Sequence, residues 1–148
     1  MAARLCDAEL EGASVGSREL WFNPKKIKGG KVNAEIGTAG SIPTPQRGLP
    51  AIAIQRKNEL LLFDCGEGAQ QQMMRARTGF TVNAVFITHW HADHFLGTFG
   101  LAQTLSFMGR TEPLTLYGPP GVHEFAGMVA QLCRNTLRFP GGAVEMRG

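Results

Sequence analysis

The stretch AVFITHWHADHFLGTFG, from Ala84 to Gly100, carries the most information about the fold. It begins as an apolar, β-branched run typical of a buried strand and ends with apolar residues at helical spacing. Between these runs, three of the chain's four histidines and one of its three aspartates fall within six residues. His89 and His91 are two apart in an extended segment, so both side chains can point the same way. Asp93 and His94 follow at the turn into the helix.

This cluster predicts a metal site. Two neighbouring pairs of nitrogen and oxygen ligands suit two ions such as Zn²⁺ held close together. A histidine-bearing surface turn is the alternative explanation. Four ligands with the spacing H-x-H-x-D-H at the end of a buried strand favour metal binding over that alternative. We therefore expect His89, His91, Asp93 and His94 to be metal ligands.

Composition sets broad limits on the class of protein. The chain has 148 residues, of which 43% are hydrophobic, enough for one packed domain. Its three cysteines are too few and too scattered for a disulfide framework or a C-x-x-C zinc site. No apolar run is long enough to span a membrane, and the N-terminus lacks the apolar core of a signal peptide. A cytoplasmic location is expected. The net charge of +3 permits a polyanionic partner without requiring one.

The pattern along the chain predicts an α/β fold in which strands and helices alternate. Residues 1–33 are expected to be an N-terminal extension, followed by a partial domain over residues 34–148. The closing sequence FPGGAVEMRG shows neither a helix cap nor a closing strand. The expected strands are a brief one within residues 34–48, a hairpin of residues 51–56 and 59–65, and residues 82–89 and 113–118. The expected helices are residues 66–77, a helix from Phe95, and residues 120–133.

Four segments together resemble the amino-terminal half of the ribonuclease Z family in the metallo-β-lactamase superfamily. The similarity covers about residues 35–125, and its DCGEG-x-Q segment is more specific than H-x-H-x-D-H. Ala69 and Ala92 depart from the family, which more often has Thr and Gly there, and neither position is a ligand. The segments are GTAGSIPTPQR (37–47), LLFDCGEGAQQQMMR (61–75), FITHWHADHFLGTFGL (86–101) and PLTLYGPPG (113–121).

The resemblance implies a fold and an activity. The fold would be the amino-terminal half of a metallo-β-lactamase-type αβ/βα sandwich. The activity would be that of a two-zinc endoribonuclease that removes the 3′ trailer from precursor tRNA. His89 and His91 would hold the first ion, and Asp93 and His94 the second. Asp93 would also accept the proton of the attacking water. Full-length members would form homodimers and have no membrane association.

Several other residues have competing interpretations. Asp64 either orients a histidine of the site or only forms the turn before Gly66. Glu67 is interpreted as a helix-start acid, and His123 as a solvated histidine. The remaining candidates, Cys65, Met73 and Met74, are interpreted as packing residues.

Part of the site is missing from the sequence. A complete two-metal site of this family needs a further aspartate and further histidines, and no aspartate follows Asp93. The chain is therefore expected to be a fragment or a natural truncation. Two alternatives to the RNA-cleaving function stay open. One is a hydrolase of the same fold acting on an ester or thioester, and the other is a non-catalytic half that pairs with a partner chain.

Overall fold

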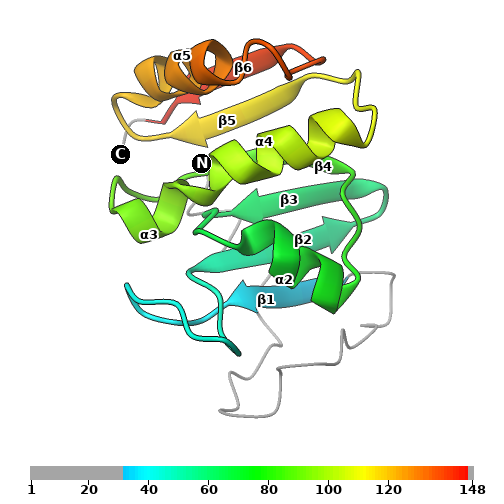
Figure 1. Cartoon of the computed structure of the whole chain (residues 1–148), viewed down its shortest axis with the longest axis vertical. Helices are drawn as coiled ribbons and strands as arrows, with labels where there is room; N and C mark the ends of the chain where they lie inside the picture. Colours follow the sequence, from blue (N-terminus) through cyan, green and yellow to red (C-terminus); the bar gives the residue numbers. More distant parts are fainter. Residues whose placement is uncertain (1–31, 147–148) are drawn as a thin grey trace.

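The computed structural model describes residues 32–146, which form a single six-stranded sheet carrying helices on one face (Figure 1). The strands lie in the order β1-β2-β3-β4-β5-β6; β1 to β3 are antiparallel, and β3 to β6 are parallel. The strands are β1 (Val32–Gly37), β2 (Ala51–Arg56), β3 (Glu59–Phe63), β4 (Val82–Phe86), β5 (Leu114–Gly118) and β6 (Gly141–Glu145). The helices are α2 (Ala69–Ala76), α3 (Ala92–Phe95), α4 (Gly97–Phe107) and α5 (Val122–Leu132).

The predicted hairpin is confirmed. β2 and β3 pair antiparallel with Arg56 opposite Glu59, leaving Lys57 and Asn58 as the two-residue turn. Lys57 takes a φ of 53°, as tight hairpin turns require. β1 pairs with β2 and begins at Val32, slightly before the start of the domain that the sequence suggested.

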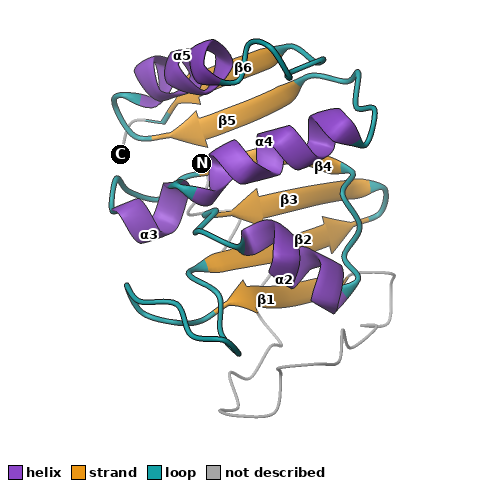
Figure 2. Cartoon of the chain, in the orientation of Figure 1, coloured by secondary structure: helices purple, strands orange, loops and turns teal. Residues whose placement is uncertain are grey.

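The core lies between the sheet and its helices (Figure 2). Along each strand, alternate side chains point to this face, as the two-residue period of a strand dictates. The sheet contributes Leu60, Leu62, Val85 and Leu116, and the helices contribute Met73, Leu101, Leu105, Phe125 and Val129, all buried in one cluster. Among the helices of residues 32–146, none has the length and apolar character needed to span a bilayer.

The opposite face of the sheet is also apolar, and no described element covers it. Phe63, Phe86 and Tyr117 stack across β3, β4 and β5, with ring centroids 4.8 and 4.7 Å apart. Ile52 and Val144 continue this row at its two ends, each 42% exposed. We call these five residues the aromatic row. A sheet with two apolar faces is typical of a layer that packs between two others.

Two expectations about element boundaries need correction. β4 ends at Phe86, whereas the sequence predicted a strand up to His89. Ile87 still donates its N–H to the Tyr117 carbonyl of β5, and the residues from Thr88 to His89 lie outside the sheet. The following helix starts at Ala92 and breaks at Leu96, because the Gly97 N–H bonds the Cys65 carbonyl outside the helix.

The expectation that FPGGAVEMRG holds no strand is wrong. Residues Gly141–Glu145 form β6, which pairs in parallel with β5. Two glycines lower the strand propensity of this segment, so the sequence gives little signal. Its pairing is supplied by the backbone of β5, where Gly141 lies opposite Leu114 and Glu145 opposite Gly118.

Candidate metal centre

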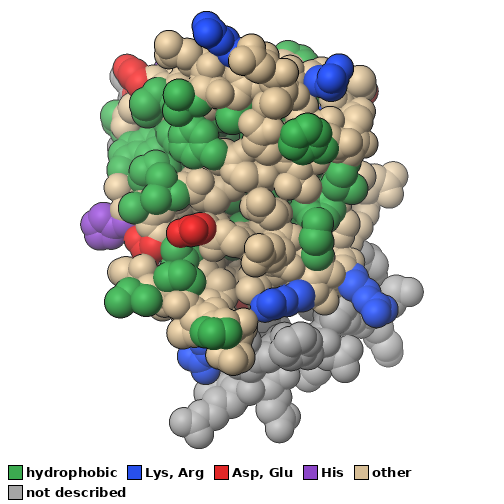
Figure 3. Space-filling model, in the orientation of Figure 1, with side chains coloured by type: hydrophobic (Ala, Val, Ile, Leu, Met, Phe, Trp, Pro, Cys, Tyr) green, Lys and Arg blue, Asp and Glu red, His purple; other side chains and the backbone are tan. Residues whose placement is uncertain are grey.

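The predicted ligands lie where β3 and β4 end, at the carboxyl edge of the parallel strands. This edge is where open α/β sheets bind their ligands. Figure 3 shows a histidine and acidic side chains together at the left side of the molecule, where Figure 1 places α3. His89, Asp93 and His94 are half-buried, and His91 is exposed. The four ligands therefore share one surface.

The DCGEG segment and the ligand segment are bonded to each other through their backbones. The Cys65 N–H donates to the His94 carbonyl at 2.7 Å, and the Gly97 N–H donates to the Cys65 carbonyl at 2.9 Å. A Cβ on Gly97 would lie 1.9 Å from the Gly66 carbonyl oxygen, and a Cβ on Gly66 would lie 2.4 Å from the Asp93 carbonyl oxygen. Glycine is required at both positions because the two backbones touch.

Asp64 contacts His94, in agreement with the first interpretation of this residue, and the nearby turn begins only at Glu67. Its carboxylate accepts the Thr88 N–H at 2.8 Å, the Thr88 hydroxyl at 2.9 Å and the His94 Nδ1–H at 2.8 Å. With Nδ1 bound in this way, Nε2 of His94 is left with its lone pair free to bind a metal. Asp64 has a φ of 58°, a left-handed conformation that aspartate tolerates better than most residues.

Thr88 extends this arrangement to His89. Its hydroxyl donates to Asp64 and lies 2.9 Å from His89 Nδ1, from which it can accept a hydrogen bond. That bond fixes the tautomer of His89 with Nε2 as the free nitrogen. Thr88 was not among the residues predicted for the site. Its position directly before H-x-H, at the end of a buried strand, was the available signal.

The predicted ligands form two pairs whose spacings fit a metal such as zinc. His89 Nε2 lies 3.1 Å from His91 Nδ1, and His94 Nε2 lies 3.6 Å from Asp93 Oδ2. Two atoms each about 2.0–2.1 Å from a tetrahedral zinc ion are about 3.3 Å apart. The two pairs are adjacent, with the His89 and His94 ring centroids 4.0 Å apart. Within residues 32–146 no three or more His, Cys, Asp or Glu side chains form one metal-binding group, so each pair is an incomplete ligand set.

The other candidates lie apart from these pairs. His123 is exposed on α5, as expected for a solvated histidine. Glu67 is exposed but precedes the N-cap Gly68, so it lies outside the first turn of α2 and the helix-start interpretation is wrong. Cys65 is fully buried, and its burial raises the pKa of the thiol to about 12, which keeps it neutral. Cys65 and Met73 belong to the core, so the packing interpretation is confirmed for both, whereas Met74 is 58% exposed and does not pack in the core.

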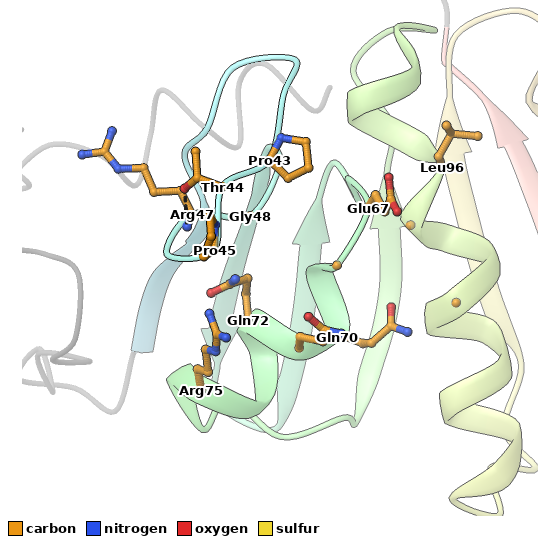
Figure 4. A pocket seen from close by; sticks show the side chains of 14 residues that line it. Pro43, Thr44, Pro45, Arg47, Gly48, Glu67, Gln70, Gln72, Arg75 and Leu96 are labelled. Carbon is orange, nitrogen blue, oxygen red and sulfur yellow. Dashed lines mark hydrogen bonds between the residues drawn. The ribbon is translucent and has the colours of Figure 1, made fainter.

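A polar cavity of about 560 Å³ opens beside the ligand segment (Figure 4). The loop at Pro43–Gly48 forms one wall, α2 the floor, and Leu96 with Gly97 the opposite side. Arg75 and Gln72 project from α2 towards the loop, whereas the Arg47 guanidinium extends away from the cavity. This cavity has no signal in the sequence, because its walls come from segments that are polar and far apart in the chain.

Two protein-family models match parts of the chain. The model of the metallo-β-lactamase superfamily matches residues 47–130, and that of RNA 3′-terminal phosphate cyclase matches residues 1–74. Ribonuclease Z of Methanosarcina mazei is 53% identical over 112 residues, which are 75% of this chain and 37% of that protein. Ribonuclease Z of Picrophilus torridus is 54% identical over 112 residues, 75% of this chain and 36% of that protein.

A solved structure shows the same relationship in three dimensions. The short form of human tRNase Z superposes with a TM-score of 0.69 at 36% identity, over 76% of this chain and 43% of that one. The chain thus spans little more than a third of the length of the curated relatives named above. The structure describes residues 32–74 of the segment that matches the cyclase model. These residues run from β1 into α2 and belong to the same sheet and helix layer as the ligand segment. With its ligand segment, its sheet and these similarities taken together, the chain belongs to the metallo-β-lactamase superfamily and is similar to the amino-terminal part of ribonuclease Z.

Proposed function

We propose that this segment supplies half of the active site of a zinc-dependent endoribonuclease that removes the 3′ trailer from precursor tRNA. The observation that carries the proposal is the arrangement of two ligand pairs around Asp64. The chain that carries this arrangement is 53% identical over 112 residues to the ribonuclease Z of Methanosarcina mazei. The segment would act within a protein of cytoplasmic location that forms a homodimer in its complete form. Residues 1–31 would be an extension of the domain, since residues 32 and 33 belong to β1.

Each ligand has a distinct role in this proposal. His89 and His91 would hold one zinc ion, and Asp93 and His94 a second. Bound zinc lowers the pKa of water and takes up negative charge on phosphoryl oxygens. Asp93, whose carboxylate lies at the site, would accept the proton that the attacking water loses. Asp64 and Thr88 would keep Nε2 of His94 and of His89 directed at the ions.

The cavity beside the ligand segment has polar and cationic side chains that suit an RNA substrate. Arg75 offers a cation, and Gln70 and Gln72 offer amides that donate and accept hydrogen bonds. Leu96 and Gly97 lie two and three residues after His94, so a chain lying in this cavity would approach the proposed metal ligands. Phosphate contacts from arginine contribute affinity without reading sequence.

A chimeric protein tests the proposal. Residues 32–146 would replace the matching segment of the Methanosarcina mazei relative, which provides the remaining two thirds of the protein. The chimera should cut a precursor tRNA at the 3′ side of its acceptor stem. Asp93→Ala should lower the cleavage rate by about a hundredfold or more, because a positioned proton acceptor contributes that much. His123→Ala, at an exposed position outside the site, is the matched control.

The alternatives give different results in the same assay. A folded chimera that hydrolyses a small ester or thioester but leaves the RNA intact would favour a hydrolase of other specificity. A folded chimera inert towards every substrate, beside an active Methanosarcina parent, would favour a non-catalytic half.

Arg75→Ala should weaken RNA binding and lower the slope of log affinity against log salt by about one.

A further inference from the structure

Trp90 lies between the two histidines of the first pair, yet its side chain packs away from them. Its indole N–H donates to the Pro120 carbonyl at 2.8 Å, in the turn between β5 and α5. Its ring lies 5.5 Å from that of Phe95 and 5.3 Å from that of Phe125, centroid to centroid. Trp90 therefore connects the ligand segment to α3 and to the β5–α5 turn.

The backbone on either side of Trp90 is held at Thr88, whose N–H donates to Asp64 at 2.8 Å, and at His91, whose carbonyl accepts the His94 N–H at 2.8 Å. β4 ends at Phe86 and α3 begins at Ala92. Within residues 32–146, no backbone–backbone hydrogen bond is donated by the amides of His89 or Trp90. A ligand segment outside regular secondary structure depends on side chains for its position. The largest side chain available there is Trp90.

The four ligands differ in how they are held. Thr88 and Asp64 orient His89 and His94 by hydrogen bonds to the nitrogen that faces away from the site. His91 is exposed, and the interactions described for its ring are those with His89. The position of the His91 imidazole therefore depends on its own backbone, which the His94 N–H holds at the carbonyl and which Trp90 anchors one residue earlier.

We infer that Trp90 is a positioning residue that holds His91 for the first metal ion by anchoring the ligand segment to the Pro120 carbonyl. This inference rests on the metal ligands of the proposed function. It implies an asymmetry between the two pairs. Loss of the anchor weakens metal binding by His89 and His91, while Asp93 and His94 stay supported by Asp64 and the backbone of Cys65.

Zinc affinity measured in two backgrounds of the chimera with the Methanosarcina mazei relative, which provides the rest of the protein, tests the asymmetry. Asp93→Ala leaves the His89–His91 pair, and His91→Ala leaves the Asp93–His94 pair. Competition with a chromogenic chelator then gives the affinity of each pair for Zn²⁺ alone. Trp90→Ala should weaken binding about tenfold in the first background, the lower range for loss of a residue supporting a ligand. In the second background it should change binding by less than about twofold.

Two further variants separate anchoring from folding. Trp90→Phe keeps an aromatic ring but lacks the N–H, and should weaken the first pair about fivefold, the worth of one hydrogen bond. Phe107→Ala, at the exposed end of α4, is the control and should change neither pair. Equal losses in both backgrounds, or no loss in the first, would overturn the inference for Trp90. Absence of zinc binding in the Asp93→Ala background, before Trp90 is changed, would instead refute the metal assignment and the inference with it.

Discussion

Asp64 Oδ2 lies 2.8 Å from His94 Nδ1, although thirty residues separate the two in the chain. This contact joins the end of β3 to α3 and fixes the nitrogen of His94 that faces the site. The same carboxylate receives both the amide and the hydroxyl of Thr88. One buried acid thus orients two of the four proposed ligands.

Asp64→Asn should weaken zinc binding by the Asp93–His94 pair about tenfold to a hundredfold, the range for residues that orient a metal ligand. Asparagine tolerates the left-handed φ of 58° at this position but loses the charge and one acceptor oxygen. Chelator competition in the His91→Ala background measures the change. Glu67→Gln, an exposed acid nearby, is the control. Unchanged affinity in Asp64→Asn would show that the contact does not support the metal site.

Gly97→Ala should lower the free energy of unfolding by about 3 kcal/mol or more, because overpacking against a rigid backbone is costly. The new Cβ would lie 1.9 Å from the Gly66 carbonyl oxygen. Gly127→Ala is the matched control, since a Cβ on this α5 residue meets nothing within 4 Å. The free energy of unfolding of Gly127→Ala should rise by about 0.5–1 kcal/mol, because alanine has a higher helix propensity than glycine. Urea unfolding measures both, and equal effects would refute the close approach of the two segments.

The buried Cys65 thiol should make the protein less stable as pH rises. Its folded pKa is raised from 9.0 to about 12, chiefly by burial. The unfolded thiol therefore loses its proton first, and the stabilising contribution is lost as pH rises from about 9 to 12, by up to about 1.4 kcal/mol per pH unit. Cys65→Ala should show a smaller loss of unfolding free energy between about pH 8 and 10.5. Identical losses in the two proteins would contradict this account of Cys65.

The aromatic row should make the isolated chain self-associate. Its five side chains form an apolar surface on the face of the sheet that no described element covers, and such surfaces mark interfaces. Light scattering coupled to size-exclusion chromatography should detect oligomers, and Phe86→Glu should reduce them. Met74→Glu, which removes an exposed apolar residue from α2, should leave association unchanged. A monodisperse, cooperatively melting monomer of the parent chain would contradict this prediction.

The sequence predicted elements where a local signal was strong. Lys57 and Asn58 between two apolar runs marked the hairpin, and the buried run before His89 marked the central strand. β6 escaped prediction because its pairing comes from β5 and not from its own glycine-rich residues. The residues of the candidate site show the same difference between local and long-range signals. The four ligands are clustered in sequence, whereas the support from Asp64, Thr88 and Pro120 depends on contacts between distant segments.

Zinc content after dialysis tests most directly the central claim that this chain carries half of a two-metal site. The isolated chain should retain well under one ion, because each ion finds only two of the ligands it needs here. The chimera with the Methanosarcina relative should retain about two ions, and single His91→Ala or Asp93→Ala changes should lower that number. Two tightly held ions in the isolated chain, or no zinc in a folded chimera, would contradict the account.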